Sequence, residues 1–200
     1  MVSKTEVDKR RLRTMLQRDD IAQIIEDYDR MKLRIGMTAS HSALDICDGG
    51  IEEGFPTVAY CQEGRHKTYA NYFKTKRSSS GRVLRGMVDK AIVMPSFNDV
   101  MNDSMQVEMR KRNVVYIPNR SFTSYSSIED VENKFRVPLF GSRNMLRMEE
   151  RTEEQDYYWI LDKAGLPYPE AIENPEDIDC LVIVKLHHAQ KKLELSLIHI

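Results

Sequence analysis

The sequence predicts an α/β fold in which a mostly parallel sheet carries helices on both faces. Between residues 20 and 141, short β-branched segments alternate with segments of helical periodicity, which is the pattern of successive βαβ units. Parallel strands joined in this way place their connecting helices on the two faces of the sheet. The 200 residues are 41% hydrophobic and 30% charged, so they can form one ample domain, or one domain and part of another.

A charged segment and a helix open the chain. Residues 1–19 are dense in Lys and Arg and are predicted to form an extension outside the core. After Asp19 or Asp20, apolar side chains recur at the i, i+3, i+4 and i+7 positions between Ile21 and Tyr28. This spacing predicts an amphipathic helix with an acidic cap, whose apolar stripe packs on the following sheet.

Strands and helices then alternate through the predicted domain. Gly54 can end the first of these helices, and Asp103 or Ser104 can cap the second. Pro118 closes the fourth strand, because it has no amide hydrogen to donate to a neighbour. The expected strands are 33–38, 57–62, 90–94, 113–118 and 136–141, and the expected helices are 41–54, 102–112 and 127–135.

Three further segments lie outside this alternation. Residues 76–86 are rich in Ser, Gly and basic side chains and are predicted to be a surface insertion. Residues 142–165 have the pattern of a helical connection, and a helix capped by Asn174 is expected to start at Pro175. The last strand, at 180–186, begins what we predict to be a second domain.

The charge and cysteine content exclude several classes of protein. With 30 Lys and Arg against 31 Asp and Glu, the net charge is -1, whereas a general nucleic-acid binder needs a clustered excess of base. No apolar run approaches the ~18 residues of a membrane helix, and the charged N-terminus has no signal-peptide pattern. The three cysteines include no CxxC pair, which favours a reducing compartment. We therefore expect a cytoplasmic protein with neither a nucleic-acid nor a membrane partner.

Polar side chains follow the carboxyl ends of the predicted strands, where open parallel sheets bind their ligands. His41 and Ser42 follow the first strand, Arg65 follows the second, and Asn119 and Ser121 follow the fourth. Arginine donors, hydroxyl groups and the amides of a helix that begins near Ser42 suit an anionic, polar ligand. No GxGxxG motif follows the first strand, so a dinucleotide in its usual pose is not expected.

Each of these residues also has a purely structural explanation. His41 can donate to a loop carbonyl instead of contacting a ligand. Asn119 and Ser121 can be turn formers, which is the more frequent role of such residues. Arg65 can belong to a solvated loop. The residue types alone leave these alternatives open.

Basic residues beyond the fifth strand form a second candidate set. Arg143 and Arg147 lie near the junction with the second domain, although both can pair with the acidic run that follows them. Lys185 lies inside a strand, where a charge is costly to bury unless it meets an anion or lies at the sheet edge. His187 and His188 are adjacent and face opposite sides of a strand, so they are not predicted to share a metal ion.

Several spaced motifs resemble one known family. They are SHSALDICDGGIEEGF, EGRHKTYANYF, VVYIPNRSF, VENKFRVPLFGSRNMLRMEER and KAGLPYPEAIENPEDIDCLVIVKL. In this order they resemble the archaeal PurP family, the formate-dependent 5-aminoimidazole-4-carboxamide ribonucleotide ligases. The resemblance runs from residue 20 to residue 194, with the basic insertion at 76–86 as its main departure.

The resemblance implies a Rossmann-like pre-ATP-grasp domain at 20–141, followed at 142–194 by a linker helix and the beginning of an ATP-grasp domain. In the family, ATP phosphorylates formate, and the amine of the carboxamide ribonucleotide attacks formyl phosphate to give the formamido ribonucleotide, ADP and phosphate on the route to IMP. ATP and Mg²⁺ or Mn²⁺ are the implied cofactors. The implied partners are the small-molecule substrates, and homo-oligomerisation is left open.

The resemblance also implies roles for individual residues. His41 and Ser121 match family positions that contact the ribonucleotide, and Lys185 matches the lysine that reaches the ATP phosphates. The full predicted ribonucleotide-binding set is His41, Ser42, Arg65, Asn119 and Ser121, and the full predicted ATP-binding set is Arg143, Arg147 and Lys185. The catalytic residues and the acidic metal ligands are expected in the part of the family sequence that follows residue 194, so no metal ligand is predicted in this chain.

The chain differs from the family at its end. After Glu194 it finishes with LSLIHI, which is also the in-frame translation of a common sequencing-library adapter, CTGTCTCTTATACACATC. Residues 195–200 are therefore predicted to be non-native, and the chain to be an N-terminal fragment that is inactive alone. Two other functions stay open here. One is a non-catalytic Rossmann-like module that binds a phosphorylated small ligand, and the other is an ATP-grasp ligase with a different carboxylate and amine.

Overall fold

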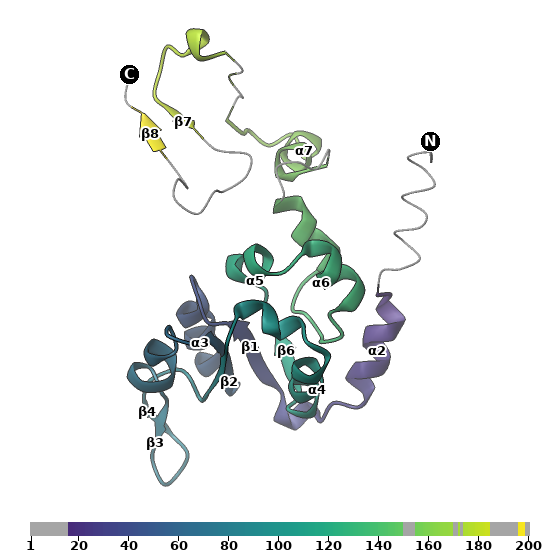
Figure 1. Cartoon of the computed structure of the whole chain (residues 1–200), viewed down its shortest axis with the longest axis vertical. Helices are drawn as coiled ribbons and strands as arrows, with labels where there is room; N and C mark the ends of the chain where they lie inside the picture. The colour runs from purple at the N-terminus through teal and green to yellow at the C-terminus, as the bar shows by residue number, and fades with distance from the viewer. Residues whose placement is uncertain (1–15, 150–154, 170–171, 173, 185–195, 199–200) are drawn as a thin grey trace. The chain divides into compact units, whose positions relative to one another are not determined.

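The computed structural model describes residues 16–149, 155–169, 172, 174–184 and 196–198. The chain divides into two compact units, Met1–Arg143 and Asn144–Ile200. The first unit carries the parallel sheet and every residue that is predicted to bind a ribonucleotide (Figure 1).

The sheet of the first unit has four strands, and all of its strand pairs are parallel. Its order is β5-β2-β1-β6, so β1 lies between β2, the strand that follows it in the chain, and β6, the last strand of this sheet. The strands are β1 (Arg34–Thr38), β2 (Thr57–Gln62), β5 (Lys90–Met94) and β6 (Val114–Tyr116). Each coincides with a predicted strand, and the predicted α/β fold with a mostly parallel sheet is confirmed.

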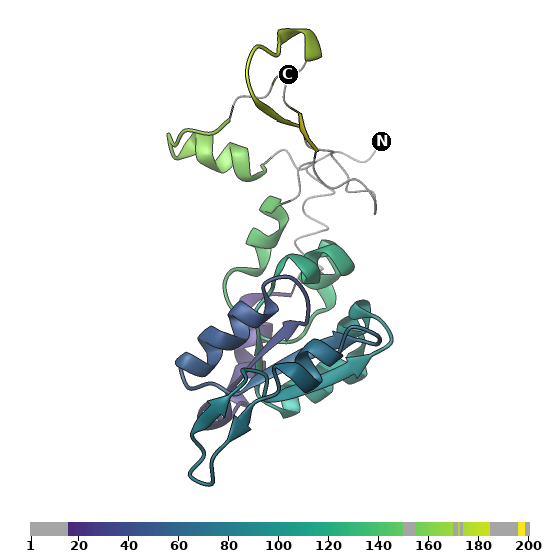
Figure 2. The ribbon, with the colours of Figure 1, turned by 90° about the vertical axis from the view of Figure 1, so that its left-hand side faces the viewer.

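Helices cover both faces of this sheet (Figures 1 and 2). The chain alternates between strand and helix, and α3 contacts β1 and β2 while α4 contacts β6. The helices of the unit are α2 (Arg18–Glu26), α3 (Ala43–Glu52), α4 (Asp103–Lys111), α5 (Arg120–Tyr125) and α6 (Ile128–Lys134), with shorter turns at η1 (Arg30–Lys32), η2 (Thr68–Tyr72) and η3 (Phe97–Met101).

The two faces of the sheet have different cores. On the α3 face, the buried side chains Met37, Cys47 and Cys61 pack with small residues such as Ala43 and Ala59. On the opposite face, four buried aromatic rings lie with their centroids 4.9–6.0 Å apart, and these are Tyr60, Tyr116, Phe122 and Phe135. Burial of such rings is a large apolar contribution to stability. It also fixes α5 on the end of β6, because Phe122 belongs to α5.

The buried thiols predict a simple labelling pattern. Cys47 and Cys61 are buried, and burial raises the pKa of both thiols to about 12, whereas Cys180 is exposed. Because the thiolate is the reactive form, we expect a disulfide reagent at pH 8 to modify one thiol of the native chain rapidly and all three after unfolding in urea. The fast reaction should disappear in Cys180→Ser. Rapid labelling that persisted in this variant would contradict the burial of the other two thiols.

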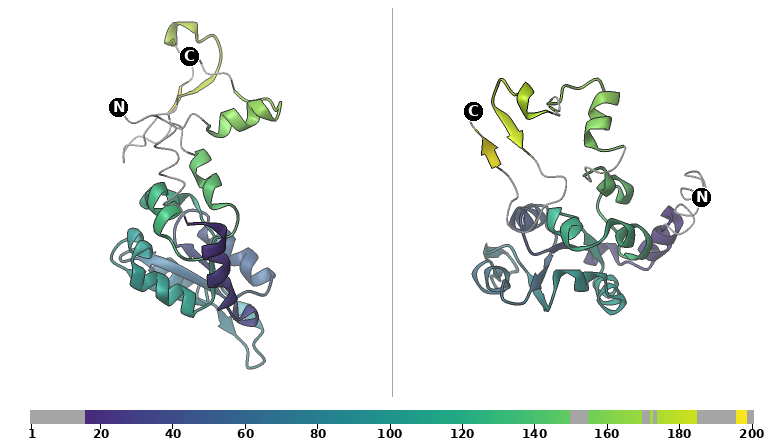
Figure 3. Two further views of the ribbon diagram at one scale, coloured as in Figure 1. Left: turned by 90° about the vertical axis from the view of Figure 1, so that its right-hand side faces the viewer. Right: turned by 45° about the horizontal axis from the view of Figure 1, so that its top comes forward.

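α2 lies on the β6 side of the first unit (Figure 3). The helix begins earlier than predicted, with Gln17 as its N-cap, and the Asp20 carboxylate accepts a 2.8 Å hydrogen bond from the Gln17 amide. None of its residues is buried, so the predicted apolar stripe packs only partly. The contact with the sheet comes instead from Tyr28, whose hydroxyl donates to the Val114 carbonyl at 2.9 Å.

The predicted fifth strand at 136–141 is reduced to a single parallel bridge between Tyr116 and Leu139. The Tyr116 amide donates to the Pro138 carbonyl and the Phe140 amide donates to the Tyr116 carbonyl, both at 2.8 Å. Pro138 has no amide hydrogen, so the ladder cannot continue through it. The segment therefore lies beside β6 without forming a strand.

The predicted surface insertion at 76–86 contains a hairpin of β3 (Lys76–Arg77) and β4 (Val83–Arg85), visible in Figure 1. Arg77 fixes this hairpin to the main sheet through a 2.7 Å ion pair with Asp89. Lys74 adds a hydrogen bond to the Asp89 carbonyl. The insertion is thus attached to the residue that immediately precedes β5.

The second unit contains α7 (Tyr157–Lys163), η5 (Pro175–Asp177), and the antiparallel strands β7 (Val182–Val184) and β8 (Ser196–Ile198), while η4 (Arg143–Glu149) begins at the boundary. Asn174 precedes η5 as predicted but makes no side-chain cap, and its Nδ2 donates instead to the Asp177 carboxylate at 3.2 Å. The non-native origin of residues 195–200 remains a prediction. Across the ranges that the structure describes, no helix combines the length and the apolar character needed to cross a membrane.

Candidate functional site

The direction of chain progression through the sheet reverses at β1. β2 pairs with one edge of β1, and β6 pairs with the other. The connections that leave β1 and β6 therefore diverge, and such a reversal opens a crevice at the carboxyl ends of the strands where α/β sheets bind ligands. The loops after β1 and after β6 meet at this point. We refer to them together, residues 39–42 and 117–121, as the carboxyl corner.

Asn119 joins the two loops of the carboxyl corner. Its Nδ2 donates to the carbonyls of Thr38 at 2.9 Å and Ser40 at 3.2 Å. Its Oδ1 accepts from the Phe122 amide at 3.1 Å and so caps α5. Both amide hydrogens and the carbonyl are used within the protein, and the side chain is buried. Asn119 is therefore a positioning residue in this structure, and a direct ligand contact by it stays a prediction.

His41 forms the turn between β1 and α3 with a backbone φ of 44°. This left-handed conformation is uncommon for a residue with a Cβ, costs about 1 kcal/mol or more, and is concentrated at functional sites. The imidazole is exposed, and it has no hydrogen-bond partner within the described part of the chain. The alternative in which His41 donates to a loop carbonyl is therefore not realised.

Ser121 lies in the first turn of α5 and is 1% exposed. Its hydroxyl is buried and has no hydrogen-bond partner among the described residues. Leaving a buried hydroxyl unpaired costs about 1–3 kcal/mol, so such a group calls for a partner that the described residues do not supply. Ser42, on the facing loop, is exposed and makes no side-chain cap at the start of α3. The first amides of α3 thus also lack a side-chain acceptor, which favours an anion at this end.

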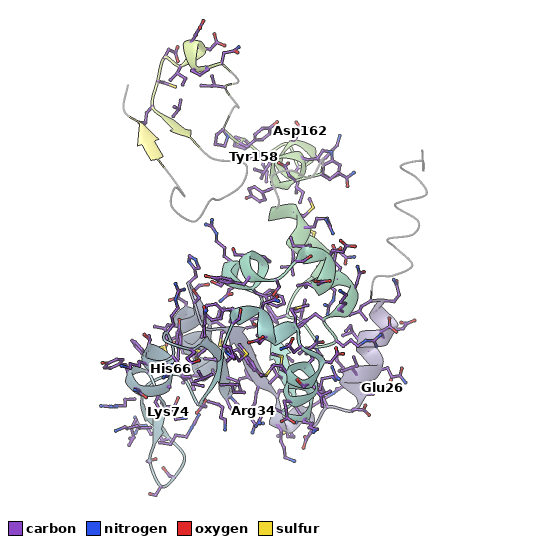
Figure 4. All side chains as sticks on the ribbon, viewed as in Figure 1. Glu26, Arg34, His66, Lys74, Tyr158 and Asp162 are labelled. Carbon is purple, nitrogen blue, oxygen red and sulfur yellow. The ribbon has the colours of Figure 1, made fainter. Side chains whose placement is uncertain are left out.

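Arg65 follows β2 on the loop next to the carboxyl corner. Gly64 adopts a φ of 82° to form the turn, and the Arg65 amide donates to the Gln62 carbonyl at 3.0 Å. The guanidinium is exposed and is joined by no hydrogen bond or ion pair to the loops after β1 and β6. The neighbouring His66, labelled in Figure 4, has a buried Nδ1 without a partner in the described ranges.

The predicted ATP-binding residues are not brought together by the described structure. The Nη1 and Nη2 atoms of Arg143 donate to the carbonyls of Val131 at 2.6 Å and Val137 at 3.1 Å. Burial lowers the pKa of Arg143 to about 10, which leaves it a cation at neutral pH. Arg147 lies half-buried in η4, and Lys185 lies outside the described residues. ATP binding by these three side chains stays a prediction.

No group of three or more His, Cys, Asp or Glu side chains in the described ranges could hold a metal ion. The Mg²⁺ or Mn²⁺ that the family resemblance implies is therefore assigned to no described side chain.

Two features of the loops after β2 and β6 were missed from the sequence. The first is α5 itself, although an Asn after a proline is a strong helix N-cap and Asn119 could have predicted it. The second is the π-helical turn η2 after β2, a rare conformation that is frequent at functional sites. No simple sequence signal predicts a π-helix.

An all-parallel sheet that reverses at β1 and carries helices on both faces (Figure 2) defines a Rossmann-like α/β domain. The chain belongs to the family described as "Protein of unknown function (DUF1246)", whose sequence pattern matches residues 35–172.

Curated relatives of this chain carry a more specific name. A protein of Methanopyrus kandleri is 37% identical over 177 residues, and one of Methanocaldococcus jannaschii is 36% identical over 177 residues. Each match covers 88% of this chain and 45% of the relative, so the chain spans about half the length of these proteins. Both relatives are named "5-formaminoimidazole-4-carboxamide-1-(beta)-D-ribofuranosyl 5'-monophosphate synthetase".

A solved structure supports the same relationship. It is titled "Crystal structure of an IMP biosynthesis protein PurP from Thermococcus kodakaraensis", and it matches with a TM-score of 0.54 and 26% identity over 82% of this chain and 45% of that chain. The resemblance to the PurP family that the sequence motifs predict is therefore confirmed.

Proposed function

We propose that this chain supplies the ribonucleotide-binding domain of a 5-formaminoimidazole-4-carboxamide ribonucleotide synthetase, an enzyme of purine biosynthesis. The observation that carries the proposal is the carboxyl corner, where Asn119 holds the loop of His41 against the loop that bears Ser121. An exposed imidazole and a buried unpaired hydroxyl can hydrogen-bond a phosphorylated ribose. The names of the curated relatives supply the identity of the ribonucleotide.

The proposed reaction is an ATP-dependent formylation that forms a carbon–nitrogen bond. ATP transfers its terminal phosphoryl group to a formate oxygen, which gives formyl phosphate and ADP. The 5-amino nitrogen of the ribonucleotide then attacks the formyl carbon, the carbon–oxygen bond to phosphate breaks, and the nitrogen loses a proton. Phosphorylation is needed because a carboxylate oxygen is a poor leaving group. Formyl phosphate must also be kept from water, so the ribonucleotide corner has to be covered during the reaction.

We place the ATP-dependent half of this chemistry largely outside the described residues. Lys185 is the proposed contact to the ATP phosphates, as a cation that offsets charge on the transferred group, with Arg147 as a second contact. Arg143 would contribute mainly by fixing the segment that leads to them, since its donors already serve two carbonyls. We assign no metal-dependent step to the described side chains. The proposed setting is the cytoplasm, with small-molecule substrates as partners and homo-oligomerisation left open.

Ser121→Ala should separate binding from folding. Removal of an unpaired buried hydroxyl should leave the free energy of unfolding unchanged or slightly increased, because the alanine needs no hydrogen bond. The same change should weaken binding of 5-aminoimidazole-4-carboxamide ribonucleotide about tenfold, as expected for one lost hydrogen bond. Isothermal titration calorimetry of the chain measures the affinity, and urea unfolding measures the stability. Ser124→Ala, an exposed serine in the same helix, is the matched control and should change neither quantity.

His41→Gly is a second variant for the same measurements of ribonucleotide affinity and stability. Glycine adopts a φ of 44° without strain, so the variant should fold at least as well while losing the imidazole contact. Retention of full ribonucleotide affinity in both Ser121→Ala and His41→Gly would show that the carboxyl corner is not the binding site. Absence of any heat with the unaltered chain, under conditions where a full-length relative binds, would refute the proposed function of this chain.

A further inference from the structure

A cavity of about 410 Å³ opens at the amino-terminal edge of the sheet, the end opposite the carboxyl corner. Its walls come from the first residues of three strands, because Arg34 begins β1, Lys90 begins β5 and Val58 is the second residue of β2. The turn after α3 and the β3–β4 hairpin complete it through Gly54, Pro56 and Arg77. Figure 4 labels Arg34 at this end, away from α5. A volume of this size is in the range of small-molecule sites, which is roughly 300–1,000 Å³.

The cavity is strongly cationic. Four of its side chains are positive and one is negative, which leaves a net charge of +3, and these are Arg34, Arg77, Lys90, Arg112 and Asp89. Asp89 is already occupied, since it accepts from both Nε and Nη2 of Arg77 and from the Thr57 amide. Within the described residues, no carboxylate pairs with Arg34 or Lys90. The positive charge of this cavity therefore exceeds what its own carboxylate can offset.

Nearby negative groups reduce this charge without cancelling it. Glu108 contacts Arg112 at 3.4 Å, but it also pairs with Lys111 at 3.1 Å, so its charge is shared with a cation outside the cavity. The C-terminal ends of α3 and α4 point to this edge, and each contributes roughly half a negative charge. Nη1 of Arg34 partly offsets this negative charge, because it donates a hydrogen bond at 3.1 Å to the carbonyl of Arg112, the C-cap residue of α4. The two helix ends together lower the charge of +3 to about +2, and the shared Glu108 lowers it further, so a net positive charge remains.

Two buried polar atoms on the same side of the sheet also lack partners among the described residues. They are Nε of Arg112 and the hydroxyl of Tyr60. The Arg112 side chain lines the cavity, whereas Tyr60 does not. Nε of Arg112 is therefore an unused donor on a residue of the cavity wall, and an acceptor-rich anion is the kind of ligand that such a donor fits.

We propose that this cavity is a second anion site, which binds a small phosphate compound carrying two or more negative charges. Forked arginine donors from Arg34 and Arg112 suit phosphate oxygens, and Lys90 adds a point charge at the rim. The site lies at the opposite end of the strands from the carboxyl corner, so a ligand here does not compete directly with a ribonucleotide there. The proposal is independent of the proposed function, because it uses none of the residues of the carboxyl corner.

Lys90→Gln and Arg34→Gln test this site with inorganic pyrophosphate as the probe. Pyrophosphate should bind the unaltered 200-residue chain in calorimetry, and its affinity should fall when the ionic strength is raised from about 0.05 M to about 0.5 M. Lys90→Gln should weaken binding about tenfold, as expected for one lost charge-assisted hydrogen bond. The Lys90 side chain is exposed and forms no hydrogen bond within the described residues, so its replacement should not disturb folding. Arg34→Gln should weaken binding at least as much.

The matched control is Lys67→Gln, which removes an exposed surface cation after β2 that does not line the cavity and makes no side-chain hydrogen bond or ion pair within the described residues. It should leave pyrophosphate affinity unchanged. The proposal is overturned if pyrophosphate does not bind, if Lys90→Gln and Lys67→Gln have equal effects, or if Ser121→Ala abolishes pyrophosphate binding while Lys90→Gln does not. The last result would place the anion at the carboxyl corner. Unchanged ribonucleotide affinity in Lys90→Gln, together with weakened pyrophosphate binding, would establish two separate sites.

Discussion

Asn119→Ala is expected to destabilise the folded chain by about 3 kcal/mol, through three hydrogen bonds lost together. The change removes the side-chain cap of α5 and one of the two donors to each of the Thr38 and Ser40 carbonyls, which keep only the backbone amides of Ser40 and Ala43. Because these bonds join the loop after β1 to the start of α5, the carboxyl corner should also lose its ribonucleotide affinity. Urea unfolding followed by circular dichroism measures the first effect, and calorimetry at low temperature measures the second.

Two matched variants separate the parts of this effect. Asn119→Asp keeps an acceptor for the Phe122 amide but places a carboxylate against two carbonyl oxygens, so it should be nearly as destabilising as alanine. Asn98→Ala removes an exposed asparagine side chain that makes no hydrogen bond, and it should change stability by less than about 0.5 kcal/mol. Equal stability of Asn119→Ala and Asn98→Ala would contradict the positioning role of Asn119.

Gly36→Ala should be similarly damaging, for a steric reason. Gly36 lies in the middle of β1, and a methyl group there would overlap Val114 Cγ1 and come within 3.3 Å of the Tyr60 ring. β1 is hydrogen-bonded on both sides, so the backbone cannot move away without loss of strand pairing. We expect a loss of about 3 kcal/mol, at the upper end of the range for overpacked cores. The midpoint of urea unfolding reports this change.

Gly49→Ala is the matched control for this glycine. Gly49 lies within α3, and a methyl group on it meets nothing within 4 Å. Alanine is favoured over glycine in a helix by about 1 kcal/mol, so this variant should be more stable than the parent chain. Opposite signs for the two Gly→Ala changes are the expected result. A neutral Gly36→Ala would mean that β6 does not pack against β1 as described.

The order of the elements could be predicted because it depends on local patterns. Apolar runs such as 57–62 and 90–94 predict a strand from their own residues alone. Capping residues and helical periodicity likewise predict the helices between the strands. The rule that ligands bind at the carboxyl ends of parallel strands selected His41 and Ser121 among other polar residues as candidates, and their contacts with a ligand stay predictions. The failures have equally local causes, as in the segment 136–141, where Pro138 prevents the ladder that the apolar pattern predicts.

The roles of individual side chains could not be predicted in the same way. Asn119 was selected as a ligand contact, and whether its amide faces a ligand or the carbonyls of Thr38 and Ser40 depends on atoms about 80 residues away in the chain. Arg143 shows the same limit, since its pairing with two carbonyls follows from the path of the chain after α6. The cationic cavity was missed because its basic residues are far apart in the sequence and form no motif. They come together only when the first residues of neighbouring strands line up at one edge of the sheet.

The central place of β1 in the sheet also constrains the order of folding. β1 pairs with β6 through residues about 80 positions apart, and the Thr38 hydroxyl meets the Tyr116 hydroxyl at 2.6 Å across that separation. During synthesis, β1, β2 and β5 can associate early, yet one edge of β1 stays unpaired until β6 has left the ribosome. Long-range pairing of this kind slows folding, because the entropy of closing the loop is lost before the contacts form. The carboxyl corner joins the loops that follow β1 and β6, so we expect it to be among the last parts of the domain to form.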